Sequence, residues 1–135
     1  MQLDREATPV SSKVPPSGDA ATKALDDLVV AIDDCMEQLQ GARARAVELL
    51  ASRNAGTPWL DIVTAESRPL VVETVSNVLS TLARTGSAFR REQAYALQSE
   101  RVSINRIAAL FGVTRQRISA LLRERAADED AAPTG

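Results

Sequence analysis

The chain of 135 residues contains no histidine and a single cysteine, Cys35. Without histidine it lacks the commonest general base, the usual activator of a nucleophile and a frequent metal ligand. One cysteine excludes both an internal disulfide and a cysteine-based metal cage. The sequence also has no glycine-rich loop of the kind that cradles phosphates. We therefore expect no enzyme, no cofactor and no bound metal.

Aromatic side chains and long apolar runs are scarce as well. Only 3% of the residues are aromatic, although 44% are hydrophobic, so any core is built from aliphatic side chains. No run approaches the roughly 18 apolar residues that a membrane span requires. Residues 1–18 lack the apolar stretch of a signal peptide. We therefore expect a cytoplasmic protein with no membrane partner.

Composition divides the chain into four parts. Residues 1–18 are rich in proline and serine with few large apolar side chains, which predicts a disordered N-terminal segment. Residues 19–86 and 87–126 show helical periodicity and predict two helical regions. Residues 127–135 contain the run Asp128-Glu129-Asp130 and predict an acidic flexible tail.

A long helix is predicted from about Asp19 to about Arg53, ended by Asn54-Ala55-Gly56. Two series of side chains repeat along it every seven residues, the spacing of a coiled-coil seam. They are Leu25, Ile32, Leu39 and Ala46, and Leu28, Cys35, Ala42 and Leu49. This helix either packs within the monomer or forms a dimer, and its length favours a dimer. The dimer interface is then expected at Leu25, Leu28, Ile32, Cys35, Leu39 and Leu49.

Three shorter helices are predicted to follow. Thr57 is expected to cap a helix that reaches about Glu66 and turns three side chains inward, namely Trp59, Ile62 and Val63. Ser67 is expected to cap the next, which carries a valine-rich stripe and ends at Gly86. Ser87 then begins a helix to about Ser99. Beyond it, Arg101 stands where a left-handed residue is needed and glycine is the usual choice.

Residues 102–123 predict two short helices joined by a tight turn. Ser103 can cap the first helix, Gly112 supplies the left-handed residue that ends it, and Thr114 can cap the second. Apolar side chains give each helix one inward face, namely Ile104, Ile107, Ala108, Phe111, Val113, Ile118 and Leu121. The outward face of the second helix holds Arg115, Gln116, Arg117, Ser119 and Ala120.

Charge is distributed unevenly along the chain. The net charge of −2 combines −5 over residues 1–66, +6 over residues 67–125 and −3 over residues 126–135. A basic C-terminal unit beside an acidic N-terminal region is the electrostatic pattern of a nucleic-acid reader with a separate partner segment.

The segment from Phe111 to Ile118 resembles the promoter-reading segment in region four of bacterial sigma factors. It is also similar to the helix-turn-helix of small bacterial transcriptional regulators. The resemblance covers about twenty residues, or about forty with the preceding helix, and implies that the second helix lies in the DNA major groove. The chain is too short, and has too few aromatic residues, for the promoter-melting domain of a sigma factor.

We therefore expect an all-α protein with a long N-terminal helix and a helical bundle that ends in a helix-turn-helix. Residues 19–86 form its dimerisation or partner region, and residues 87–126 its DNA-binding domain. The expected function is sequence-specific binding of double-stranded DNA by a homodimeric transcriptional regulator. Base contacts are expected from Thr114, Arg115, Gln116, Arg117 and Ser119. Phosphate contacts are expected from Ser103, Arg90, Arg91, Arg101, Arg106 and Arg123.

Two alternatives stay open at this stage. The acidic N-terminal helix could bind a protein partner of the transcription machinery, which would make the chain a helical interaction module. The basic unit could instead coat DNA as a sequence-tolerant architectural protein. Arginines immediately after Thr114 favour the reader of specific sequences.

Overall fold

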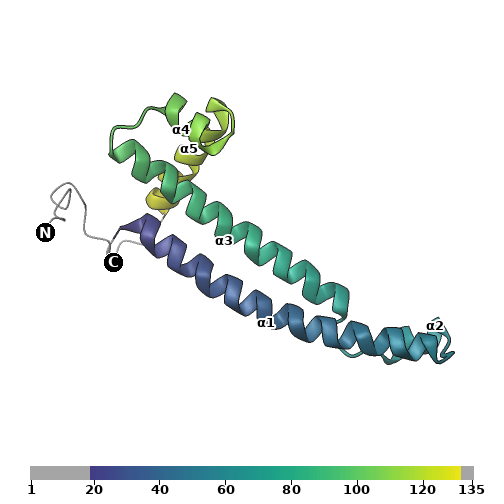
Figure 1. Ribbon diagram of the computed structural model, residues 1–135. Coiled ribbons are helices and arrows are strands. Elements are labelled where there is room, and N and C mark those ends of the chain that lie inside the picture. Colours follow the sequence, from purple (N-terminus) through teal and green to yellow (C-terminus); the bar gives the residue numbers. More distant parts are fainter. Residues whose placement is uncertain (1–18, 132–135) are drawn as a thin grey trace, which may run out of the picture.

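Figure 1 presents a computed structural model of the chain, in which residues 19–131 are described. This part of the chain forms five helices and no strand, which confirms the predicted all-α class. The helices are α1 (Ala20–Asn54), α2 (Trp59–Ala65), α3 (Val71–Ser99), α4 (Ile104–Phe111) and α5 (Arg115–Ala131). None of them is both long and apolar enough to cross a membrane. The predicted disordered segment, residues 1–18, lies outside the described residues.

The predicted bounds of the long helix are confirmed by α1. Its first turn is capped by Asp19, whose carboxylate accepts a hydrogen bond of 2.6 Å from the backbone N–H of Thr22. That hydrogen bond lowers the pKa of Asp19, because it favours the charged carboxylate. The chain leaves the helix at Ala55 and turns at Gly56, whose φ of 99° is accessible to glycine without strain.

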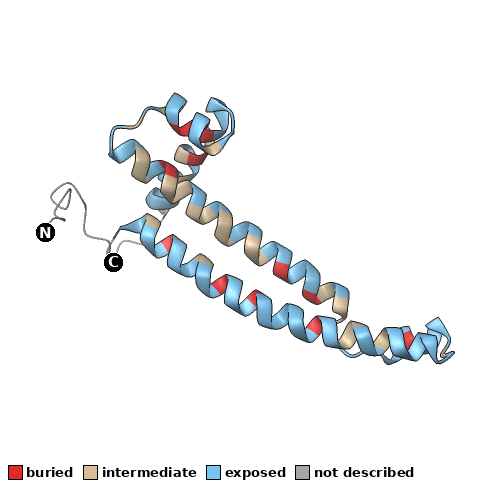
Figure 2. Cartoon of the chain, viewed as in Figure 1, coloured by how far each residue is buried: buried red, intermediate tan, exposed pale blue. Residues whose placement is uncertain are grey.

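Helices α1 and α3 form a long antiparallel hairpin, with α2 in the connection at its tip (Figure 1). Cys35 lies beside Val78, with its Sγ 3.9 Å from the Val78 carbonyl oxygen, and Arg45 donates a 3.1 Å hydrogen bond to the hydroxyl of Thr74. The buried side chains of α1 along this contact are all small, namely Ala24, Ala31, Cys35 and Ala42. Small side chains allow two helix backbones to approach each other closely. The buried residues of α1 therefore form a narrow stripe along the hairpin (Figure 2).

Helix α1 carries two parallel seams, and only one of them faces α3. The inner seam contains the buried or half-buried positions Ala24, Leu28, Ala31, Cys35, Ala42 and Leu49. The outer seam lies one residue further on, or about 100° around the helix, and contains Leu25, Val29, Ile32, Met36, Leu39 and Leu50. Its side chains are 41% to 59% exposed. The predicted dimer interface therefore mixes the two seams, since Leu28, Cys35 and Leu49 belong to the inner one.

Helix α3 runs without a break through Gly86, so the prediction that Gly86 ends a helix is wrong. Gly86 has no left-handed backbone, whereas Gly56 and Gly112 do. Helix α3 is packed at both ends, because Thr74 and Val78 are buried near its start and Ala94 is buried near its end. The outer seam of α3, defined as Val72, Val75 and Leu79, is 38% to 67% exposed.

The short elements at the hairpin tip differ from the prediction. Trp59 is 55% exposed and Val63 is exposed too, so only Ile62 of the predicted inward side chains is buried. A seven-residue helix turns one narrow face toward α1, which leaves its neighbours in solvent. Residues Thr57 and Ser67 do not act as caps, because α2 and α3 begin after Pro58 and Leu70.

Side chains near the start of α3 replace the predicted serine cap. The backbone N–H of Leu70 donates to the Glu73 carboxylate over 2.8 Å, and that of Val71 donates to the Glu66 carboxylate over 2.7 Å. The first of these bonds, helped by Arg68, lowers the pKa of Glu73. Two carboxylates thus satisfy backbone donors that a helix leaves without an internal partner.

The two kinds of glycine give opposite expectations for substitution by alanine. Gly41 lies within α1, and an added Cβ would meet its nearest neighbour at an ordinary 3.6 Å. Gly41→Ala should therefore stabilise the fold by about 1 kcal/mol, or about 3 °C in Tm. Gly112→Ala should destabilise it by about 1 kcal/mol, because φ of 69° is left-handed. Thermal unfolding followed by circular dichroism measures both, and a Tm lowered by Gly41→Ala would contradict an unbroken α1.

Candidate nucleic-acid interface

The C-terminal end of α3 packs with α4 and α5 into a three-helix unit. Its core is a cluster of five buried side chains, namely Ala94, Ile107, Ala108, Ile118 and Leu121. The helix predicted to begin at Ser87 is therefore the last part of α3, and it belongs to both the hairpin and this unit. As a result, the position of α5 relative to the hairpin is fixed through α3.

The local geometry of the turn confirms the predicted capping residues. Ser103 accepts a 3.1 Å hydrogen bond from the backbone N–H of Arg106, and the Thr114 hydroxyl accepts one of the same length from Arg117. Gly112 is left-handed, with φ of 69°, and the next N–H, that of Val113, donates to the carbonyl of Ala108 over 3.0 Å. Helix α4 therefore ends at Phe111, and α5 begins at Arg115 after a turn of three residues.

The outward surface of α5 brings together four polar side chains. Arg115, Gln116, Ser119 and Arg123 line an open hollow of about 340 Å³. Three of them were predicted to contact bases, whereas Arg123 was predicted to contact phosphate. Within residues 19–131 neither Arg115 nor Arg123 forms an ion pair. Several hydrogen-bond donors therefore point outward from the first turns of one helix.

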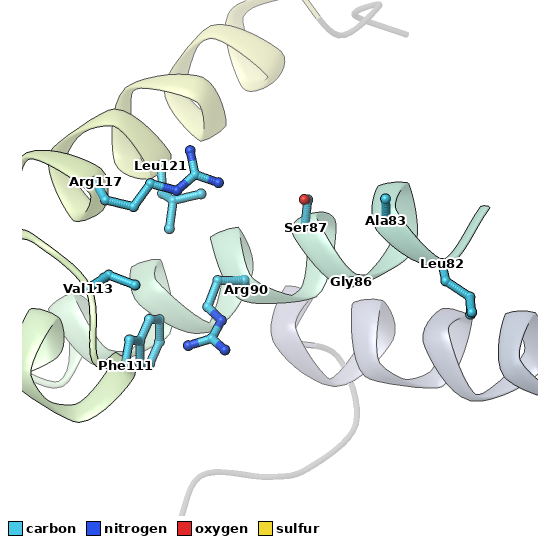
Figure 3. A pocket seen from close by; sticks show the side chains of 9 residues that line it. All are labelled: Leu82, Ala83, Gly86, Ser87, Arg90, Phe111, Val113, Arg117 and Leu121. Atoms are coloured by element: carbon cyan, nitrogen blue, oxygen red, sulfur yellow. The ribbon is translucent and has the colours of Figure 1, made fainter. Parts of the chain in front are cut away.

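Arg117 lies apart from that group. It lines a second hollow, of about 420 Å³, between α3 and the turn that precedes α5 (Figure 3). Arg90 reaches the same hollow from α3, and its guanidinium carbon lies 4.3 Å from the centre of the Phe111 ring. Most of the remaining wall is apolar. The side chain of Arg117 thus lies along the edge of α5 that faces α3.

The remaining predicted phosphate contacts have different environments. Arg106 is exposed on α4, and Arg101 is exposed at φ of 69°, so the left-handed backbone predicted at Arg101 is confirmed. Arg91 is only half-buried and pairs with Asp128 over 3.1 Å. The Ser103 hydroxyl already accepts a backbone hydrogen bond. Arg101 and Arg106 are therefore accessible to a partner, whereas Arg91 already pairs with Asp128.

An ion-pair network that the sequence analysis missed ties α5 to α3. The Arg125 guanidinium bonds to Glu92 over 3.0 Å and to Glu129 over 3.2 Å, and it stacks on the Tyr95 ring at 3.6 Å. The hydrogen bond that Arg125 donates to the Glu92 carboxylate is the main reason why the pKa of Arg125 is raised. The pair Arg125 and Glu129, four residues apart, has a sequence signal. The pair with Glu92 has none, because 33 residues separate the two.

This network also changes the description of the acidic tail. Helix α5 continues to Ala131, so residues 127–131 are helical where the sequence predicted a flexible segment. Asp128 and Glu129 are held against arginines on the surface of the three-helix unit. The rest of the predicted tail, residues 132–135, lies outside the described residues.

Comparison with known proteins assigns the chain to no family. No family model matches it, and the comparisons with curated proteins and with solved structures found no match. The resemblance of residues 111–118 to region four of sigma factors therefore stays a prediction. The functional argument rests on the geometry of the α4, turn and α5 segment itself.

The position of α5 should depend on Arg125. Arg125→Met removes the cation that hydrogen-bonds to the half-buried Glu92 over 3.0 Å and leaves only Arg91, at 3.9 Å, so we expect the free energy of unfolding to fall by about 1–3 kcal/mol. The matched control is Arg123→Met, two residues away on the same helix, where the side chain is exposed and the cost should stay under about 0.5 kcal/mol. Urea denaturation of both variants provides the comparison. Equal losses in the two variants would mean that the network does not anchor α5.

Proposed function

We propose that the protein is a sequence-specific regulator of transcription in the bacterial cytoplasm that binds double-stranded DNA as a dimer, with α5 in the major groove. One observation carries the proposal. Arg115, Gln116, Ser119 and Arg123 share one outward hollow on a helix whose start is fixed by Gly112 and Thr114. A helix of this width fits the major groove, where base edges display hydrogen-bonding groups.

The side chains on α5 match that chemistry. An arginine can donate two hydrogen bonds to guanine, and a glutamine can pair with adenine. Arg115 and Gln116 occupy the first turn, where a side chain enters the groove most deeply in this class of motif. Thr114 and Ser119 supply hydroxyls on either side of them. Arg117, on the edge that faces α3, would reach a base at the border of the contacted site.

Arginines around α5 would hold the DNA backbone. Arg106 and Arg101 are exposed on α4 and on the segment before it. Arg90 and Arg123 extend the positive surface along α3 and along α5. A cation near the start of a helix opposes the helix dipole, so the cluster after Thr114 is explained better by a bound polyanion than by helix stability. Contacts of this kind position the protein without reading sequence.

The proposed dimer uses the exposed part of the predicted interface. Leu25, Ile32 and Leu39 lie in the outer seam of α1, where a second chain can reach them. Leu28, Cys35 and Leu49 already face α3 within one chain. The same exposed seam would serve the alternative function, a helical module that docks on a protein of the transcription machinery. A test of duplex binding distinguishes the DNA-binding regulator from the interaction module, because only the regulator requires α5 to contact DNA.

Two variants should distinguish contacts to DNA bases from contacts to DNA phosphates. Gln116→Ala should weaken binding to the best duplex by about 1–3 kcal/mol and relax the preference at one base pair. Arg106→Ala should weaken all duplexes about equally and lower the slope of log K against log salt by about one. Arg53→Ala, at the far end of the hairpin, is the control.

Fluorescence anisotropy titrations at several salt concentrations, with selected and scrambled duplexes, test these expectations. If wild-type protein binds no duplex, DNA binding is rejected and the interaction module takes its place. If it binds every duplex equally, the architectural function replaces sequence-specific regulation.

The acidic end of α5 should weaken non-specific binding. Asp128 pairs with Arg91 and competes with phosphate for it. Asp128→Asn should therefore tighten binding to a scrambled duplex about threefold at low salt, the range of an exposed ion pair. Asp130→Asn removes the same charge, and Asp130 has no ion pair among residues 19–131. Anisotropy in low salt compares the two, and equal gains would assign the effect to net charge alone.

A further inference from the structure

The exposed seams of α1 and α3 lie on the same side of the hairpin. On each helix the outer seam follows the inner seam by one residue, which is a rotation of about 100° in the same sense around the helix axis. The helices face each other through their inner seams and run in opposite directions. Equal rotations about antiparallel axes therefore turn both outer seams toward one side. The hairpin has one broad apolar face that spans both helices.

The size of this face matches that of a protein interface. Nine large aliphatic side chains, each about half exposed, present on the order of 700 Å² of apolar surface. Soluble monomers rarely leave more than a few hundred Å² of contiguous apolar surface exposed. A standard interface buries about 800 Å² on each partner. The face is therefore large enough for a stable dimer.

Both seams have the geometry of half a four-helix bundle. Apart from Leu39 and Leu50, which are eleven residues apart, their positions are spaced by three and four residues, the spacing of helices that cross at a shallow angle. A second copy of the same hairpin supplies the same two seams, so stacking the two faces covers all four. A lone partner helix would cover only part of the face.

Heights along the bundle determine which positions each choice of symmetry axis brings together. Cys35 lies beside Val78 and Arg45 beside Thr74, so positions 36 and 79 lie at about the same height. An axis along the bundle keeps heights unchanged and puts α1 of one chain against α3 of the other. Met36 and Leu39 of one chain then lie opposite Leu79 and Val75 of the other, and Arg43, exposed in the same register between Leu39 and Leu50, comes near the height of Glu73 of the partner subunit.

We propose that the outer seams of α1 and α3 form the interface of a parallel homodimer, a four-helix bundle that holds both α5 helices at the same end. The orientation rests on the proposed DNA-binding function, because only α5 helices at one end of the bundle can reach neighbouring half-sites together. Helix α3 thereby belongs to the interface as much as α1 does. The axis runs along the bundle, with α1 of each chain packed on α3 of its partner.

The first experiment measures assembly. Met36→Lys places a charge in the middle of the face, and sedimentation equilibrium at tens of micromolar should show a dimer converted to monomer with helicity retained. Val30→Lys is the matched control, since Val30 is exposed on α1 outside both seams, and it should stay dimeric. A monomeric wild type, or equal dissociation by the two variants, overturns the proposal.

The second experiment determines orientation by disulfide formation. In a Cys35→Ala background, Met36→Cys and Leu79→Cys are made as separate proteins, unfolded together, refolded and oxidised. A parallel bundle places position 36 against position 79 of the partner. Only the mixture should therefore give covalent dimers, at about half of the total, and each protein alone should give none.

An antiparallel bundle whose axis crosses at this height would place position 36 against position 36 and position 79 against position 79. Self-linking by either protein alone overturns the proposal, as does a dimer that yields no covalent product in the mixture. Neither experiment involves DNA. Failure here therefore leaves DNA binding through α5 intact, and a chain that dimerises as proposed but binds no duplex would reject DNA binding alone.

Discussion

Packing of α1 on α3 through small side chains is the interaction on which the other elements depend. Ala24, Ala31, Cys35 and Ala42 bring the two backbones close, yet they bury little apolar area. When two helices pack together, each covers only one apolar stripe of the other, and α1 and α3 each carry two such stripes. The hairpin alone therefore has a modest core, and much of its aliphatic surface stays exposed. Stability from a second layer of helices is the physical reason to expect that the chain assembles with a copy of itself.

Helix α3 connects the apolar face to the surface of α5. Its N-terminal half carries the outer seam, and its C-terminal half supplies Ala94 to the core of the three-helix unit. Because no flexible linker separates the halves, α5 keeps a fixed direction relative to the hairpin. The Arg125 network reinforces this connection at the outer end of α5. In the proposed dimer, the spacing between two DNA-reading helices would then be set by the bundle and not by the DNA.

Sequence reasoning succeeded where the cause of a structure is local. Ser103, Gly112 and Thr114 act through hydrogen bonds that span three to five residues, so their roles, the bounds of α4 and the start of α5 could be predicted. Arg101 needed a left-handed backbone for the same local reason. The failures involve packing across the chain. Gly86 stops a helix only when tertiary contacts do not extend it, and heptad counting cannot tell which of two neighbouring seams meets α3. The division of the arginines between two hollows likewise depends on where α3 passes.

The distribution of charge explains how a protein with net charge −2 can present a positive surface to the proposed DNA partner. Arg115 and Arg123 are unpaired within residues 19–131, whereas Arg91 and Arg125 pair with acids of α3 and of the last turns of α5. The acids thus neutralise Arg91 and Arg125 near the C-terminal end of α5 and leave the outward hollow at its start positive. Non-specific attraction to DNA grows with the number of phosphates that the protein neutralises, whereas phosphate contacts carry no sequence information directly. Pairing arginines away from the reading surface therefore raises the ratio of specific to non-specific binding. In the proposed regulator the acidic end of α5 acts on both fold and function, because the ion pairs that fix α5 on α3 also withdraw cations from the DNA backbone.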